Sequence, residues 1–158
     1  MAFHVDLTAN ESYGKPADAV DRHFIMHRRV DFTETANQLA QTETMGLFQV
    51  PPYVLVEEVI MIVRTADADV SDVDIGRYST AGVVAAVDAF VDGATIAATG
   101  CIRDLAGETY SKQDGTVGYM GAAAWTIGLI NNDADTINEA VIDFFAICLD
   151  LRNTDVDD

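Results

Sequence analysis

The chain has 158 residues, of which 9 are Lys or Arg and 26 are Asp or Glu, so its formal net charge is −17. This length suits a single domain, and a hydrophobic fraction of 49% excludes a disordered acidic tail, which would be poor in apolar residues. The negative charge argues against binding to nucleic acid or to an anionic membrane surface, because both require clustered basic residues. No apolar stretch reaches the roughly 18–20 residues of a membrane span.

The charge is unevenly distributed along the chain. Residues 1–31 hold four basic residues, five acidic residues and all three histidines, a net of −1, whereas the remaining 127 residues carry −16. The basic cluster between Arg22 and Arg29 has two interpretations: it pairs with the protein's own acids, or it contacts an acidic partner or a neighbouring copy of the chain. In the second case the expected contact residues are Arg22, His23, His27, Arg28 and Arg29.

The first third of the chain begins without clear periodicity. Residues 1–19 predict an extended arm or loop, and residues 20–32 alternate with a period of two, which indicates a strand. The polar residues 33–44 predict a linker or short turn. A short apolar stretch, residues 45–50, follows and ends at Pro51-Pro52, because neither proline can donate to a sheet ladder.

The most distinctive segment is residues 53–64, YVLVEEVIMIVR, which is long and rich in β-branched residues. Alternation predicts that one face carries Val54, Val56, Ile60 and Ile62, with Glu58 as its polar interruption. The opposite face is also apolar, interrupted by Glu57. A strand that is apolar on both faces is covered on both sides, so we expect these four residues to lie in the core or at a subunit interface.

The rest of the chain continues the pattern of short strands and polar turns. We expect an acidic turn at 65–74, strands at 73–78, 116–121, 125–130 and 140–151, a turn at 131–135, and a flexible tail at 152–158. Residues 79–115 are the least regular, with one short helix or strand near 83–90. Six to eight evenly spaced strands predict an all-β fold, a β-sandwich or single jelly roll over residues 20–151 with an extended N-terminal arm.

The sequence lacks the motifs of a catalytic or metal centre. All three histidines lie within the first 27 residues, so a transition-metal site has no third ligand of the expected kind. The acidic stretches at 67–71 and 131–135 alternate like a calcium loop but lack its glycine and its final glutamate, so solvated turns are favoured. Cys101 and Cys148 are far apart and are interpreted as two small buried apolar residues rather than as a disulfide. We expect no enzyme, cofactor or metal.

The order of features from Val30 to Leu151 resembles the single-jelly-roll decoration, or cement, proteins on the heads of tailed bacteriophages. The segments that carry the resemblance are RRVDFTETANQLAQTETMGLFQVPPYVLVEEVIMIVRTA, VDIGRYST at 73–80, AVDAFVDGATI at 86–96, and WTIGLINNDADTINEAVIDFFAICLDL at 125–151. The resemblance implies a homotrimer that binds the major capsid protein outside the head, at three-fold or quasi-three-fold positions, and clamps the lattice. It also implies that the protein has no cofactor and no catalytic activity. It further implies that the protein is made in the host cytoplasm.

Two other functions stay open from the residues alone. A carbohydrate- or receptor-binding jelly roll of a head spike, fibre or tail would display aromatic residues on a concave face, and the candidates are the five tyrosines, Tyr13, Tyr53, Tyr78, Tyr110 and Tyr119. Exposure of Tyr78, Tyr110 and Tyr119 on one shared surface would favour this function. A hydrolase with paired acids would hold two carboxyl groups close together in a cleft, one of them with a raised pKa.

Overall fold

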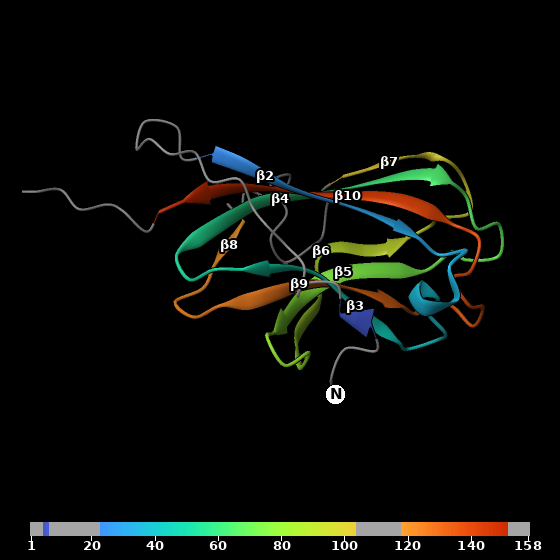
Figure 1. Ribbon diagram of the computed structural model, residues 1–158, viewed down its shortest axis with the longest axis horizontal. Coiled ribbons are helices and arrows are strands. Elements are labelled where there is room, and N and C mark those ends of the chain that lie inside the picture. The colour runs from blue at the N-terminus through green and yellow to red at the C-terminus, as the bar shows by residue number, and fades with distance from the viewer. Residues whose placement is uncertain (1–4, 7–22, 104–117, 152–158) are drawn as a thin grey trace, which may run out of the picture.

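The computed structural model describes residues 5–6, 23–103 and 118–151 as two β-sheets packed face to face (Figure 1). In these residues there is no α-helix, and the one 3₁₀ turn, η2, spans Thr35–Asn37. No helix among them is long and apolar enough to cross a membrane. The strands are β1 (Val5–Asp6), β2 (His23–Asp31), β3 (Thr44–Val50), β4 (Val54–Thr65), β5 (Val73–Ser79), β6 (Val84–Ala94), β7 (Gly100–Ile102), β8 (Tyr119–Met120), β9 (Trp125–Asn131) and β10 (Val141–Asp150).

The strand order is that of a jelly roll. One sheet, the β10 sheet, has the order β2-β10-β4-β7, and the short strand β8 also pairs with β4. The other, the β9 sheet, has the order β1-β3-β9-β5-β6. Most successive strands lie in different sheets; the exceptions are β5 and β6, which are neighbours in the β9 sheet, and β7 and β8, which both pair with β4. All pairs are antiparallel except β1 with β3. This confirms the predicted all-β sandwich.

The core lies between the two sheets and is built from alternate residues of their strands. In β10, Ile142, Phe144, Ala146 and Cys148 face inward and are fully buried. Trp125 is 4% exposed, as expected for a core residue, and its ring contacts aromatic rings of β6 and β8. Burial of this apolar surface is the main favourable contribution to the stability of such a sandwich.

The prediction that Val54, Val56, Ile60 and Ile62 share one face of β4 is wrong for the last two residues. The pairing with β10 passes from Val56 opposite Cys148 to Glu58 opposite Ile147, so one residue of β4 is bulged. The bulge reverses the alternation: Val54 and Val56 lie in the core, whereas Ile60 and Ile62 lie half-buried on the outer face of the sheet. A period of two counted along the sequence does not reveal a bulge, which inserts one extra residue.

The region predicted to be least regular contains an eleven-residue strand, β6, followed by the short β7. Of the strand expected at 116–121, the described part is β8. The expected N-terminal arm contains β1, which pairs in parallel with β3. The rest of residues 1–22 and the tail at 152–158 lie outside the described residues, so the arm and the flexible tail stay predictions.

Gly76 of β5 lies directly against the backbone of the neighbouring strand β6. A Cβ added there would lie 2.1 Å from the carbonyl oxygen of Val87 and 2.2 Å from that of Ala86, both backbone atoms. We expect Gly76→Ala to destabilise the fold by about 2–3 kcal/mol, because backbone rather than a side chain must move. Thermal unfolding would measure the loss. Gly100→Ala, whose Cβ meets nothing within 4 Å, is the matched control and should unfold like the wild type. Equal melting temperatures for the two variants would contradict the packing of β5 against β6.

The two cysteines are free and differ in accessibility. The expectation that both are buried is wrong for Cys101, which is exposed on the short strand β7. Cys148 is fully buried, and burial, together with the nearby charge of Glu57, raises the pKa of its thiol to about 12. We expect one thiol of the folded protein to react quickly with a thiol reagent near pH 8 and the second to react only on unfolding. The Cys101→Ser variant should lose the fast phase. A fast phase that persists in that variant would show that Cys148 is accessible and would contradict its inward orientation in β10.

Candidate functional site

The outer face of the β10 sheet carries a polar cluster centred on Asp143. Asp143 follows the inward-facing Ile142 in β10 and therefore points outward, between Arg29 of β2 and Ile62 of β4 in the sheet register. In spite of this orientation the carboxylate is only 2% exposed, because neighbouring side chains cover it. The cluster joins three adjacent strands, β2, β10 and β4.

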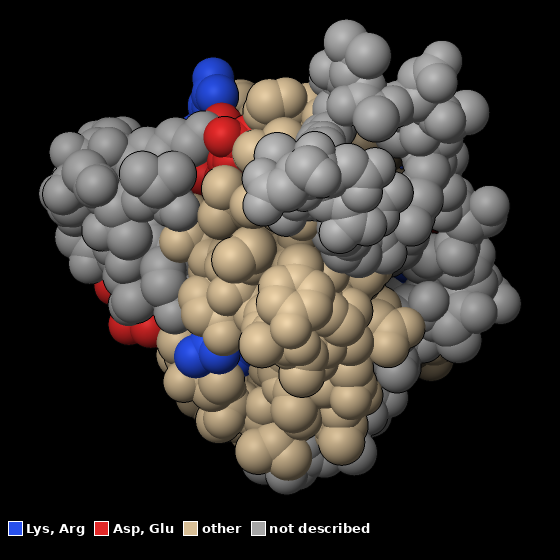
Figure 2. Space-filling model, turned by 90° about the vertical axis from the view of Figure 1, so that its left-hand side faces the viewer, with Lys and Arg blue, Asp and Glu red and all other residues tan. Residues whose placement is uncertain are grey.

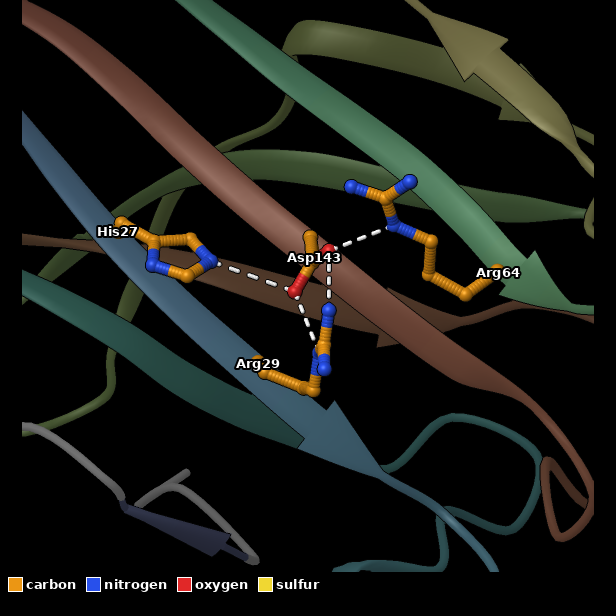
Figure 3. A network of polar contacts seen from close by, with 4 residues as sticks. All are labelled: His27, Arg29, Arg64 and Asp143. Carbon is orange, nitrogen blue, oxygen red and sulfur yellow. Dashed lines mark hydrogen bonds and ion pairs between the residues drawn. The ribbon is translucent and has the colours of Figure 1, made fainter.

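Three basic side chains converge on this carboxylate (Figure 3). Arg29 donates from Nε to Oδ1 at 2.8 Å and from a terminal nitrogen to Oδ2 at 2.9 Å, a bidentate contact. Arg64 donates from Nε to Oδ2 at 2.7 Å. His27 Nε2 lies 3.2 Å from Oδ1, and since an ionised carboxylate only accepts, this nitrogen carries the hydrogen. The His27 ring also stacks on Phe145, with ring centroids 4.5 Å apart.

The cluster is locally positive on a strongly negative protein. Hydrogen bonds from Arg29, together with those from Arg64 and His27, hold the pKa of Asp143 well below its usual range, although burial acts in the opposite direction. One carboxylate and two guanidinium groups give a formal charge of +1. The side chains of Arg29 and Arg64 are 60% and 52% exposed, so their remaining N–H groups face solvent. The arrangement can bind an anionic group of a partner.

Two further charged pairs lie on the same face. Arg103 makes a bidentate contact with Glu58, at 2.8 and 2.9 Å. His23 Nε2 lies 3.3 Å from a carboxylate oxygen of Glu57, at the start of β2. The face therefore combines paired charges with the half-buried apolar residues on the outer side of β4.

The predicted basic residues are not all on one surface. His23, His27 and Arg29 lie on the outer face of β2 and contact acids of the same chain, which is the first of the two interpretations of the basic cluster. Arg28 is half-buried and points to the opposite side of the strand. Arg22 lies outside the described residues. Contact of these residues with a partner stays a prediction.

Sequence reasoning missed the two other members of the cluster, Arg64 and Asp143. Arg64 lies at the end of the segment 53–64, and Asp143 lies inside the segment 140–151. Both segments were predicted only as apolar strands. The available signal was a single carboxylate, Asp143, in the middle of the apolar run VIDFFAICL, since an isolated acid in such a strand needs a partner. The identity of that partner depends on which strands are neighbours.

Carboxylates of the acidic turns accept hydrogen bonds from other loops of the chain. Asp67 accepts the backbone N–H groups of Asn138 and Glu139, at 2.8 and 3.0 Å. Asp133 accepts the backbone N–H and the hydroxyl of Ser71, at 2.8 and 2.9 Å, and these bonds lower its pKa. Within the described part of the chain, no three His, Cys, Asp or Glu side chains are grouped so that they could hold a metal ion.

Of the tyrosines named for a binding function, Tyr53 is 50% exposed, whereas Tyr78 and Tyr119 are engaged in the fold and Tyr13 lies outside the described residues. Tyr78 is 1% exposed, and burial raises its pKa to about 12, so it cannot belong to an exposed aromatic platform. Tyr119 accepts a hydrogen bond from Arg77 at 2.6 Å, and Tyr110 lies outside the described residues. Burial raises the pKa of Asp74, as a hydrolase acid requires, but its two oxygens accept the N–H of Gly93 and the amide of Asn132. We interpret Asp74 as a structural residue.

No protein-family model and no curated protein matches the sequence. The fold is nevertheless similar to chains of solved phage capsids. A chain in the capsid of Ralstonia phage GP4 aligns with a TM-score of 0.65 and 15% identity, over 94% of each chain. A chain in the Cyanophage Pam1 capsid aligns with a TM-score of 0.53 and 12% identity, over 90% of this chain and 96% of that one. A chain in the acidic stable capsid of Helicobacter pylori bacteriophage KHP30 gives 0.52 and 11%, over 87% and 90%. At these identities the similarity establishes the fold alone.

Replacement of Asp143 by Asn tests the polar cluster. Asn keeps the size of the side chain, but it removes the charge and places an amide N–H₂ among guanidinium donors. We expect Asp143→Asn to lower the free energy of unfolding by about 1–3 kcal/mol at pH 7, measured by urea denaturation.

The pH dependence of this difference has a defined sign. Because the folded state lowers the pKa of Asp143, its contribution is complete above about pH 5 and is lost as the pH falls below about 4. The stability curves of the wild type and of Asp143→Asn should therefore converge in acid. Asp69→Asn, at an exposed turn position, is the control and should follow the wild type. A difference that is constant from pH 7 to pH 3 would contradict an ionised, paired Asp143.

Proposed function

We propose that this chain is a structural protein of a phage virion, and specifically a decoration protein that binds the outside of the head. The observation that carries the proposal is the fold similarity to a chain of the Ralstonia phage GP4 capsid over 94% of both chains. Coverage of this extent means that the two chains share their whole architecture and not a common module within larger proteins. A jelly roll by itself serves many functions, so the resemblance of segments between Val30 and Leu151 to decoration proteins adds independent support.

In this role the chain forms a homotrimer and contacts the major capsid protein at three-fold or quasi-three-fold positions. Many copies bound to a symmetric lattice stabilise it together, so each contact can be weak. The exposed N–H groups of Arg29, a member of the basic cluster, and of Arg64 suit an acidic patch on the partner. The protein would act without cofactor or catalysis, on the virion exterior after synthesis in the host cytoplasm, and would contact neither nucleic acid nor membrane.

The alternative, a carbohydrate- or receptor-binding module of a spike, fibre or tail, requires an aromatic surface. Burial of Tyr78 removes one of the three tyrosines whose exposure on a shared surface would favour it, although Tyr53 is exposed. No observation on the described residues raises this alternative above the capsid role.

Binding to heads tests the proposal. Purified chain is added to heads assembled without it, and co-sedimentation measures the bound amount. We expect saturable binding at a fixed number of copies per head, and heads that resist heat or chelator better once they are decorated. Heads that already carry the chain are the matched control and should take up almost none, because their sites are occupied. Absence of co-sedimentation with undecorated heads, or equal uptake by both preparations, would contradict the proposal.

A further inference from the structure

The two ends of the sandwich differ in charge. At one end, the acidic end, lie the connections at 32–43, 66–72, 95–99 and 132–140. These connections contain eight acidic residues and no Lys or Arg: Glu34, Glu43, Asp67, Asp69, Asp72, Asp133, Asp135 and Glu139.

At the opposite end lie the turns at 51–53, 80–83 and 121–124, which read PPY, TAGV and GAAA. We call it the uncharged end after these turns of the described residues. These three turns contain no charged residue at all. The strands thus separate two surfaces of different chemistry.

The uncharged end also gathers the exposed apolar side chains of the described residues. Tyr53, Val83, Val84 and Met120 are 50%, 51%, 51% and 44% exposed, and all belong to the turns of this end or to the strand residues beside them. The fifth, Ile25, lies near the start of β2, which begins at the same end. Figure 2 views the molecule from the left-hand side of Figure 1, where this end lies. The described surface is mostly uncharged there, with charged residues towards its margin.

The backbone of this end is held in an unusual conformation. Tyr53 has a φ of 58°, in the left-handed region that a bulky residue rarely adopts. Its N–H donates to the carbonyl of Gly121, and its carbonyl accepts the N–H of Leu151, so two other segments fix it. The result is an aromatic side chain that is held in a fixed position and presented to solvent.

We infer that the uncharged end, with Tyr53, Val83, Val84 and Met120 at its centre, is the surface through which copies of this chain contact one another. Identical chains of charge −17 repel each other, so a symmetric contact is favourable only where the surface brings few like charges together. The ten residues of β10 separate the two ends by about 33 Å, several times the Debye length of about 8 Å in physiological salt. Contact at the uncharged end therefore buries apolar side chains while the acidic turns of the two copies stay screened from each other.

Light scattering on the full chain tests this contact. We expect the wild type to be oligomeric, and each of Val84→Asp and Tyr53→Asp to raise the dissociation constant at least about tenfold, since a charge would be buried without a partner. Ala98→Asp adds the same charge at an exposed position of the acidic end and is the matched control, which should stay oligomeric. Circular dichroism and thermal unfolding would verify that all three variants are folded.

Two further measurements separate an apolar contact from an ionic one. Val84→Lys lowers the net negative charge, so it would strengthen association if repulsion alone mattered; we expect it to weaken association as Val84→Asp does. Raising the salt from about 0.05 to 0.5 M should tighten the wild-type oligomer, because salt screens repulsion between the acidic bodies and leaves the apolar contact intact. An oligomer that dissociates in salt would instead indicate ion pairs and would overturn the inference.

This assignment of the homotrimer contact rests on the proposed function, but the two fail separately. A wild type that is monomeric at every concentration and salt, or an oligomer unaffected by Val84→Asp and Tyr53→Asp, overturns the assignment even if the chain binds heads. Variants that stay oligomeric but no longer bind heads would show that this end faces the capsid lattice, which also overturns it. Conversely, an oligomer disrupted by both variants supports the contact even if no binding to heads is found.

Discussion

The pairing of β4 with β10 is the contact on which most of the described structure depends. These two strands occupy the middle of the β10 sheet, so β2 and β7 are joined to it only through them. Their inner residues supply one wall of the core, and their outer residues bring Asp143 next to Arg64. Because the same register controls both sides, a slip of one residue would expose the core side chains and separate the charged groups at once. The stability of the fold and the geometry of the polar cluster are therefore coupled.

The distribution of charge over the surface also depends on where the strand order places each acidic residue. A chain of charge −17 folds only if its acids are paired, bonded to backbone or kept apart. Asp143 and Glu58, on the outer face of the β10 sheet, have arginine partners. Asp67 and Asp133, at the acidic end, accept backbone N–H groups of other loops. With the acids used in these ways, the turns of the opposite end are built from proline, glycine, alanine and apolar residues. The difference in charge between the two ends of the sandwich thus reflects where the acidic residues find partners.

The fold class could be predicted from the sequence because alternation and turn residues are local signals. The strands near residues 20–32, 45–50, 53–64, 125–130 and 140–151 all form close to their expected bounds. The bulge beside Glu57 could not be predicted, since it depends on the partner strand, and it moves Ile60 and Ile62 to the outer face. The strand β6 was expected only as a short helix or strand near 83–90, because alanine and glycine give it weak periodicity, and its full length extends to Ala94. The cluster around Asp143 joins residues up to 116 positions apart, so the pairs themselves required the strand order.

The strand order also gives meaning to turns that look unremarkable along the chain. PPY, TAGV and GAAA lie far apart in the sequence, and each by itself reads as an ordinary connection. The jelly-roll topology places all three at one end, together with the exposed side chains of Tyr53, Val83, Val84 and Met120. The described domain also begins and ends there, since His23 pairs with Leu149 and Leu151 bonds to Tyr53. A chain that meets its copies at this end would hold its acidic turns away from the contact, so that each subunit has a defined orientation in the assembly.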